Sequence, residues 1–246
     1  MLLVSQPVGL LLALAIALIA GGSISGSGFA AAAAGGGAGV LALGLFYLAM
    51  AIGPMSIVAP VASLGTAVPV IVGIARGESP GGLQAAGILV ALAGIALAVR
   101  EAERPHAVSV SPRALALAAL SGIGFGAFFV AIDSAASQDP AWAIVAARSG
   151  GVGLVLVAAA GRPGSVRFSR AALPALLVIG AFDIAANGLF AIASREGLLS
   201  LVSVAGSLYP VTTIILARVV LGERLARLQR LGVALALAGV ALIAAG

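Results

Sequence analysis

Two ionisable residues lie near the middle of long apolar stretches of the sequence. Arg148 follows the segment AWAIVAA, and Asp183 lies within GAFDIAANGLF, four residues before Asn187. In a membrane helix, a charge at this depth costs about 2.5–3.5 kcal/mol, so such a residue indicates a function by default. Asp183 would bind a proton or a substrate amine, and Asn187 on the same helix face would be its hydrogen-bonding neighbour. The alternative, an Arg148–Asp183 pair that only locks two helices together, fits the sequence equally well.

Prolines flanked by hydroxyl side chains form a second candidate pattern. Proline frees a backbone carbonyl in a helix, and matching interrupted helices in the two halves of a transporter point towards its substrate path. We therefore predict that Ser63, Ser207 and Tyr209 line a cavity, although a simple packing kink remains the alternative. The residues that make up the pattern are Pro60, Ser63, Thr66 and Pro69 in one segment and Ser203, Ser207, Tyr209 and Pro210 in the other.

Aromatic side chains within the apolar stretches, among them Tyr47 and Phe128, are candidates for an apolar substrate pocket. Packing in the core or against lipid is the alternative for each of them. Trp142, near the start of a predicted helix, is interpreted as a membrane-interface anchor.

The sequence argues against an enzyme and against a cofactor or metal site. There is no Cys, the single His (His106) lies in a charged segment, and Asp133, Asp139 and Asp183 are scattered. The glycine clusters GGGAG (35–39) and GIGFG (122–126) lack the Lys-Ser/Thr of a nucleotide loop. Their small-xxx-small spacing predicts close helix contacts instead.

The composition is that of a membrane protein. Hydrophobic residues make up 62% of the 246 residues and charged residues only 9%, with a mean hydropathy of +1.23, whereas soluble domains carry about 25% charged residues. No Asp, Glu, Lys or Arg occurs before Arg76. The net charge of +5 comes from arginines in short gaps and forms no basic face, so a nucleic-acid partner is excluded.

Apolar runs between charges and turn residues predict an all-α polytopic transmembrane helix bundle of about nine spans. A charged connection around 100–113 separates the fourth span from the fifth. The predicted spans are 2–20, 30–52, 55–75, 82–99, 113–132, 140–161, 171–194, 198–219 and 229–245.

The chain contains an internal repeat. A shift of 144 residues places Gly44-Leu45-Phe46 on Gly188-Leu189-Phe190 and Ser63-Leu64 on Ser207-Leu208. After one inserted residue, Gly77-Glu78 falls on Gly222-Glu223 and Leu83-Gln84 on Leu228-Gln229. We therefore predict two repeats, 1–104 and 105–246, and interpret the Gly-Glu pairs as turn and surface-charge features.

The two repeats differ in helix number. The second runs through five predicted helices and the first through four, because nothing in the first repeat corresponds to 113–132. We expect that the first helix of an original five-plus-five plan is missing. Since five is odd, the two copies would cross the membrane in opposite senses, as an inverted repeat.

Both copies carry a family resemblance that covers essentially the whole chain. GPMSIVAPVASLGTAVPV, followed by RGE and LQAAGILVALAGIAL, resembles the EamA-like branch of the drug/metabolite transporter superfamily. The second copy, GLLSLVSVAGSLYPVTTIILARVVLGERLARLQRLGVALALAGVAL, does so as well. The resemblance implies ten helices in two inverted halves, export of small metabolites or drugs, and a cavity lined by the helices of Ser63 and Tyr209.

The leading hypothesis is a secondary active transporter of small organic metabolites or drugs that works by alternating access in a bacterial inner membrane. The candidate substrate-binding residues are Asp183, Asn187, Arg148, Tyr47, Ser63, Ser207, Tyr209 and Phe128. The expected partners are a small-molecule substrate and the lipid bilayer, and a homodimer is compatible with the sequence. The alternative is a non-transporting or inactive truncated membrane protein, such as a scaffold or paralogue.

Overall fold

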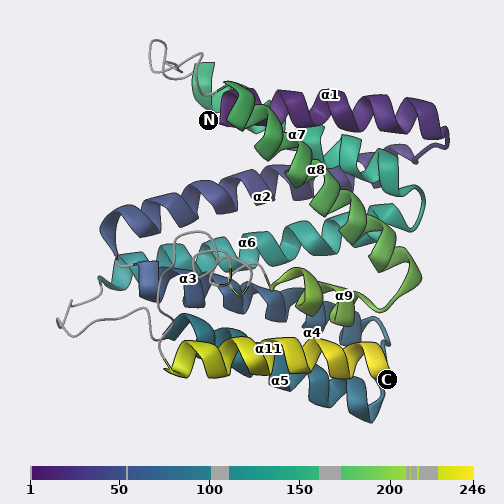
Figure 1. Cartoon of the computed structure of the whole chain (residues 1–246). Helices are drawn as coiled ribbons and strands as arrows, with labels where there is room; N and C mark the ends of the chain where they lie inside the picture. The colour runs from purple at the N-terminus through teal and green to yellow at the C-terminus, as the bar shows by residue number, and fades with distance from the viewer. Residues whose placement is uncertain are drawn as a thin grey trace. The chain divides into compact units, whose positions relative to one another are not determined.

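A computed structural model of the chain describes residues 2–53, 55–100, 111–160, 173–208, 211, 215 and 227–246, and within them all regular structure is helical (Figure 1). The predicted all-α helix bundle is thus confirmed. The elements are α1 (Leu2–Ala20), α2 (Gly26–Ile52), α3 (Met55–Ser63), the 3₁₀ turn η1 (Leu64–Thr66), α4 (Ala67–Ala75), α5 (Gly82–Arg100), α6 (Pro112–Ala136), α7 (Pro140–Ala160), α8 (Leu173–Glu196), α9 (Leu199–Gly206) and α11 (Arg227–Ala245).

Most predicted spans correspond to one helix, with ends that differ by four residues at most. The predicted span 55–75 is an exception, since it divides into α3, η1 and α4. In the predicted span 198–219 the structure shows α9, and residues 209–210, 212–214 and 216–219 lie outside the described residues. Within the span 55–75, the Thr66 hydroxyl donates a hydrogen bond of 2.9 Å to the Ser63 carbonyl, and Pro69 has no N–H to continue the helical ladder. The interruption that the Pro–Ser/Thr pattern predicted in this segment is therefore present.

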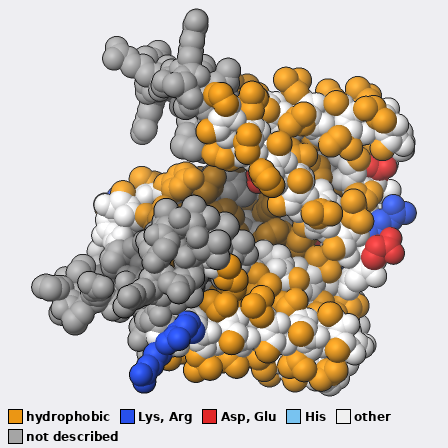
Figure 2. All heavy atoms as spheres, viewed as in Figure 1, with side chains coloured by type: hydrophobic (Ala, Val, Ile, Leu, Met, Phe, Trp, Pro, Cys, Tyr) orange, Lys and Arg blue, Asp and Glu red, His pale blue; other side chains and the backbone are white. Residues whose placement is uncertain are grey.

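Five helices of the described residues are long and apolar enough to cross a bilayer: Gly26–Ile52, Pro112–Ala136, Pro140–Ala160, Leu177–Glu196 and Arg227–Ala245. Shorter apolar helices lie at Ser5–Ala20, Val61–Ala75 and Gly82–Leu97. Large aliphatic side chains point outwards, and Figure 2 shows hydrophobic side chains over much of the visible described surface. The buried positions are mostly alanine and glycine, as expected where small residues bring membrane helices together.

The chain divides into two compact units, 1–41 with 127–197 and 42–126 with 198–246. In the first unit, α1 packs against α7 and α8. In the second, α5 packs along α11, and α4 packs against α9. Each unit takes helices from both predicted repeats, and two of these contacts join helices that the repeat relates: α1 with α7, and α5 with α11. The repeat boundary itself stays a prediction.

The α5–α11 contact is reciprocal. A Cβ added to Gly94 would collide with the Ala236 backbone, and a Cβ added to Gly239 would collide with the Ala91 backbone. The 145-residue shift maps Gly94 onto Gly239 and Ala91 onto Ala236. Repeat-related glycine and alanine residues therefore lie on both helices of this contact, and their small size lets the two backbones come close together.

The first prediction concerns this contact. Gly94→Ala and Gly239→Ala should each lower the free energy of unfolding by about 1–3 kcal/mol, because the added methyl group meets backbone that cannot rotate away. Thermal unfolding in detergent measures the effect. Gly44→Ala is the matched control, since nothing lies within 4 Å of an added Cβ there, and alanine there should be neutral or stabilising. Equal behaviour of all three variants would contradict the prediction.

Glu78 joins two segments of the second unit. Its carboxylate accepts hydrogen bonds from the backbone N–H groups of Leu199 (2.6 Å) and Ser200 (3.0 Å), at the start of α9. These two groups have no partner within the helix, so the carboxylate caps α9 and complements its dipole. Gly73 leaves room for it, because a Cβ there would collide with the carboxylate. The turn at Gly77-Glu78 was predicted correctly. The interpretation of Glu78 as a surface charge was wrong, because its carboxylate accepts hydrogen bonds from the start of α9.

The second prediction follows from this cap. Glu78→Ala should lower the free energy of unfolding by about 1–2 kcal/mol, because two N–H groups lose their acceptor. Glu196→Gln, which removes a negative charge from an exposed helix end, is the control for net charge. A melting temperature that falls equally in both variants would show that charge, and not the cap, is responsible.

Candidate functional site

The apolar interior of the first unit contains a polar cluster built by α1, α7 and α8. Arg148 forms an ion pair with Asp183, with Nη2 and Oδ2 2.5 Å apart, and its Nη1 donates a hydrogen bond of 3.1 Å to Gln6 Oε1. Asn187 Nδ2 donates to the Asp183 backbone carbonyl at 2.8 Å and to Asp183 Oδ1 at 3.1 Å. The predicted residues Arg148, Asp183 and Asn187 thus come together. The prediction that Asn187 is a hydrogen-bonding neighbour of Asp183 is confirmed.

The two charges of this cluster differ in exposure. The Arg148 side chain is 9% exposed and that of Asp183 is 49% exposed. The guanidinium is thus held inside the unit by Gln6 and Asp183, whereas the carboxylate presents about half of its surface outwards. A carboxylate so placed can accept a further donor without first giving up Arg148.

The local sequence sets the start of α7 and thereby the depth of Arg148. Asp139 caps the helix, with the Trp142 backbone N–H donating to Asp139 Oδ1 at 2.9 Å. Pro140 occupies the first helical position, where its missing N–H costs nothing. Arg148 then lies two turns further, on the face that packs against α1.

Gln6 is a functional candidate that the sequence analysis missed. It is buried, and it is the amide of α1, a helix without a charged residue. Its position also corresponds to Arg148 in the structure. Gly36 approaches the Ala147 carbonyl as Gly180 approaches that of Ser5, which sets a shift of 142 residues between α1 and α7. A lone amide in an apolar helix is the sequence signal that marks it.

Aromatic rings of α6 and α8 pack together two turns from Asp183, where Phe190 follows Asp183 by seven residues on α8. The ring centroids of Phe129 and Phe190 are 4.5 Å apart, and Phe128 follows at 5.6 Å from Phe129. Phe128 also packs on Gly39, whose added Cβ would lie 3.0 Å from the ring. Tyr47 belongs to the other unit, where it is 51% exposed with its ring 6.3 Å from Phe46. A substrate role for Phe128 or Tyr47 stays a prediction.

The predicted serines lie in the second unit. Ser63 and Ser207 are both buried, and the Ser207 hydroxyl donates to the Val204 carbonyl at 2.8 Å. On the same face of α9, the hydroxyls of Ser200 and Ser203 are fully buried, and the described residues give them no hydrogen-bond partner. Tyr209 lies outside the described residues. Cavity lining by Ser63, Ser207 and Tyr209 stays a prediction.

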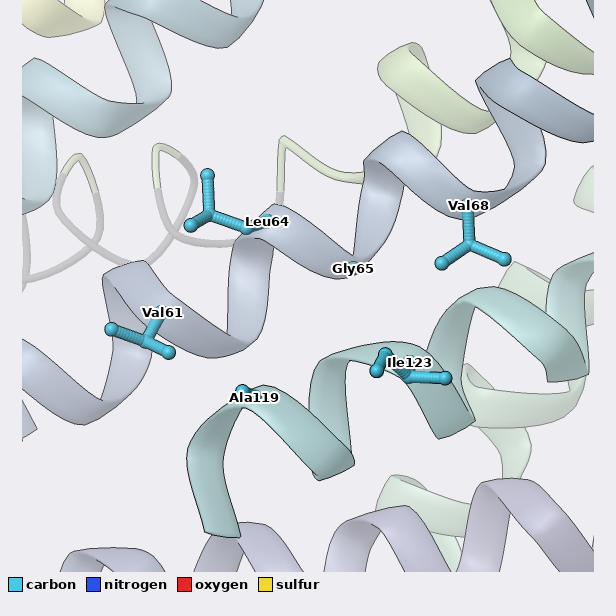
Figure 3. A pocket seen from close by; sticks show the side chains of 6 residues that line it. All are labelled: Val61, Leu64, Gly65, Val68, Ala119 and Ile123. Carbon is cyan, nitrogen blue, oxygen red and sulfur yellow. The ribbon is translucent and has the colours of Figure 1, made fainter. Parts of the chain in front are cut away.

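A shallow apolar groove of about 170 Å³ lies between α3–η1–α4 and α6 in the second unit (Figure 3). It is lined by Val61, Leu64, Gly65, Val68, Ala119 and Ile123, none of which has a polar side chain. Glycines make the approach close, because an added Cβ at Gly65 or Gly122 would meet the backbone of the other segment. This confirms the helix contact predicted from GIGFG. Without polar groups, the groove cannot orient a substrate, so the Arg148–Asp183 cluster is the better candidate site.

Within the described residues, no group of three or more His, Cys, Asp or Glu side chains is placed to hold a metal ion. The polar chemistry of the first unit's candidate site is therefore that of one guanidinium, one carboxylate and two amides.

Comparison with known proteins decides the family. The model of the EamA-like transporter family matches residues 112–245, more than half of the chain. The chain belongs to this family. The match coincides with the second predicted repeat. It makes the chain a multi-pass membrane protein of a transporter family, which is not a family of enzymes.

The fold has a solved relative. One crystal structure of a protein aligns with 98% of this chain and 86% of its own, with a TM-score of 0.78 and 19% sequence identity. At that identity the likeness shows the fold alone. No curated protein sequence matches the chain at a significant level.

The third prediction concerns the coupling of the two charges. Arg148→Met and Asp183→Asn should each lower the free energy of unfolding by about 1–3 kcal/mol, because each leaves the other partner without its counter-charge. The double variant should lose clearly less than the sum of the two. Thermal unfolding of all four proteins in detergent measures the interaction. Strictly additive losses would show that the two side chains contribute independently.

Proposed function

We propose that this member of the EamA-like family is a secondary active transporter, which moves a small organic metabolite or drug across a bacterial inner membrane by alternating access. One observation carries the proposal: the half-exposed carboxylate of Asp183, paired with the buried guanidinium of Arg148 near the middle of two membrane helices. A transporter needs a polar site at this depth, because its substrate has to be bound between the two faces of the membrane.

The geometry favours a functional pair over a purely structural one. A pair that served only to lock α7 to α8 would be expected to bury both partners, yet Asp183 is 49% exposed. Its ionised form costs free energy in an apolar span unless a donor or water reaches it. Asp183 is therefore suited to bind a proton or the ammonium group of a substrate. Arg148, Gln6 and Asn187 hold the carboxylate in place while that partner is absent.

Small organic amines are the substrate class that this site fits best. Their ammonium group complements the outward side of the carboxylate, whereas the buried guanidinium is already engaged by Gln6 and Asp183. The aromatic rings of Phe128, Phe129 and Phe190 on the same unit offer apolar contact for the remainder of such a molecule.

The fourth prediction tests transport. In proteoliposomes with an imposed pH gradient and a panel of organic amines, wild-type protein should dissipate the gradient with at least one class of compound. Asp183→Asn should reduce that rate roughly ten- to hundredfold, because a charge-assisted hydrogen bond is worth about 1.5–3 kcal/mol. Glu196→Gln, which removes an exposed charge at the end of α8, should transport like wild type.

Two other outcomes are informative. If wild type and Asp183→Asn transport at equal rates, the protein is a transporter and the pair is structural. If no compound class dissipates the gradient in well-folded protein, the non-transporting alternative gains support and the proposal is overturned for amines.

A further inference from the structure

The apolar groove between α3–η1–α4 and α6 has no part in the proposed transport site. Its volume of about 170 Å³ is below the range of about 300–1,000 Å³ that is typical of pockets enclosing a drug-sized ligand. None of its six lining residues has a polar side chain. The occupant that fits such a groove is an apolar chain that lies along it and carries its polar group elsewhere.

Glycine gives the groove its depth. Gly65 lines the groove, and an added Cβ there would meet the Gly122 backbone, so the floor lies at the level of the main chain. The rims stand out, since Leu64 is 64% exposed and Ile123 is 55% exposed. In Figure 3, the side chain of Val68 points toward the helix that carries Ile123. These residues belong to apolar helices, whose solvent in a membrane is lipid acyl chain.

One exposed face of α6 connects the groove to a cationic side chain. Arg113, Ala116, Ala119 and Ile123 recur at intervals of three and four residues, and all four are exposed. Arg113 lies in the first turn of α6, and Ala119 follows it about 9 Å further along the helix axis. Ala116, between them, has only a methyl group and leaves the surface open. A chain in the groove can therefore extend along α6 as far as the guanidinium.

The Arg113 guanidinium is available to an anion. Within the described part of the chain it has no ion pair and no side-chain hydrogen bond. Only its backbone N–H is engaged, and it donates to the Ser111 hydroxyl at 3.3 Å. A free guanidinium at the end of a membrane helix lies at the depth of the lipid headgroups, where it attracts phosphate.

Further arginines lie at the same end of the second unit. The short turn after α4 sends α5 back toward the start of α3, and there Gly53 meets Ala114 in the first turn of α6. The contacts of Gly94 and Gly239 show that α11 runs antiparallel to α5. The start of α11 is therefore at this end as well, and it carries two exposed arginines, Arg227 and Arg230. The charge of this end favours anionic over zwitterionic lipid.

We propose that the groove binds one acyl chain of an anionic phospholipid whose phosphate pairs with Arg113. The apolar lining accounts for the chain, and the free guanidinium accounts for the headgroup, because arginine binds phosphate oxygens through two parallel hydrogen bonds. The bound chain lies against η1, where the helix is interrupted between α3 and α4. The lipid site belongs to the second unit, whereas the Arg148–Asp183 pair belongs to the first.

Photolabelling of the full chain in liposomes tests the proposal. The liposomes consist of phosphatidylcholine with a trace of phosphatidylglycerol that carries a diazirine on one acyl chain. A phosphatidylcholine probe with the same labelled chain is used in parallel. After illumination and digestion, mass spectrometry measures the labelling of residues 61–68 and 119–123. Labelling around Leu89 of α5, which is 69% exposed, is the reference for general contact with lipid.

Arg113→Gln removes the proposed phosphate partner. Arg227→Gln is the matched control, because it removes the same charge from an exposed position at the same end of the unit, on α11 instead of α6. Both positions are exposed, so neither substitution disturbs a packed contact. Labelling around Leu89 shows in each case that the protein is correctly inserted.

The phosphatidylglycerol probe should label the groove, relative to Leu89, several-fold more than the phosphatidylcholine probe. Arg113→Gln should lower this labelling roughly fivefold, the effect of one basic residue near a lipid surface, and Arg227→Gln should change it less than twofold. Unlabelled phosphatidylglycerol should compete, whereas soluble glycerol 3-phosphate should not.

Three results would overturn the proposal. They are equal labelling by the two probes, an unchanged signal in Arg113→Gln, and competition by glycerol 3-phosphate, which would indicate a site for a free anion. None of these readouts depends on transport, so the proposed function is tested separately.

Discussion

Hydrocarbon supplies no hydrogen-bond partner, so every polar group that this chain carries into the bilayer needs one from the chain itself. That constraint accounts for the wholly helical regular structure of the described residues, in which the backbone satisfies itself. It also accounts for the places where the helices are interrupted. At the break between α3 and α4, the Thr66 hydroxyl donates a hydrogen bond to the Ser63 carbonyl. At the start of α9, the Glu78 carboxylate accepts hydrogen bonds from the first N–H groups of the helix.

Close contact between helices rests on small residues, because lipid is as apolar as a leucine side chain and burial of apolar area drives little association. The buried positions are largely alanine, while leucine and isoleucine point outwards. Glycines stand where two backbones meet: Gly36 with Ala147, Gly65 with Gly122, and Gly94 with Ala236. Repetition of one sequence unit gives matching small faces, which explains why α5 and α11 contact each other through equivalent residues.

The candidate site lies at positions where the two copies of the repeat differ. Asp183 stands where α2 has Gly39, and Arg148 stands where α1 has Gln6. Close contacts between helices thus occur in both copies, whereas the Arg148–Asp183 ion pair has no counterpart in the first copy.

The sequence by itself determined the membrane environment, the helical class, most helix ends and the family resemblance, because hydropathy, charge spacing and proline act over a few neighbouring residues. It also marked Arg148 and Asp183, since a charge in an apolar run stands out without a structure. Only the tertiary structure decided that these two side chains meet and that Gln6 joins them. It alone showed that Glu78 caps a helix 121 residues away. These features depend on contacts between distant segments, which local patterns do not specify.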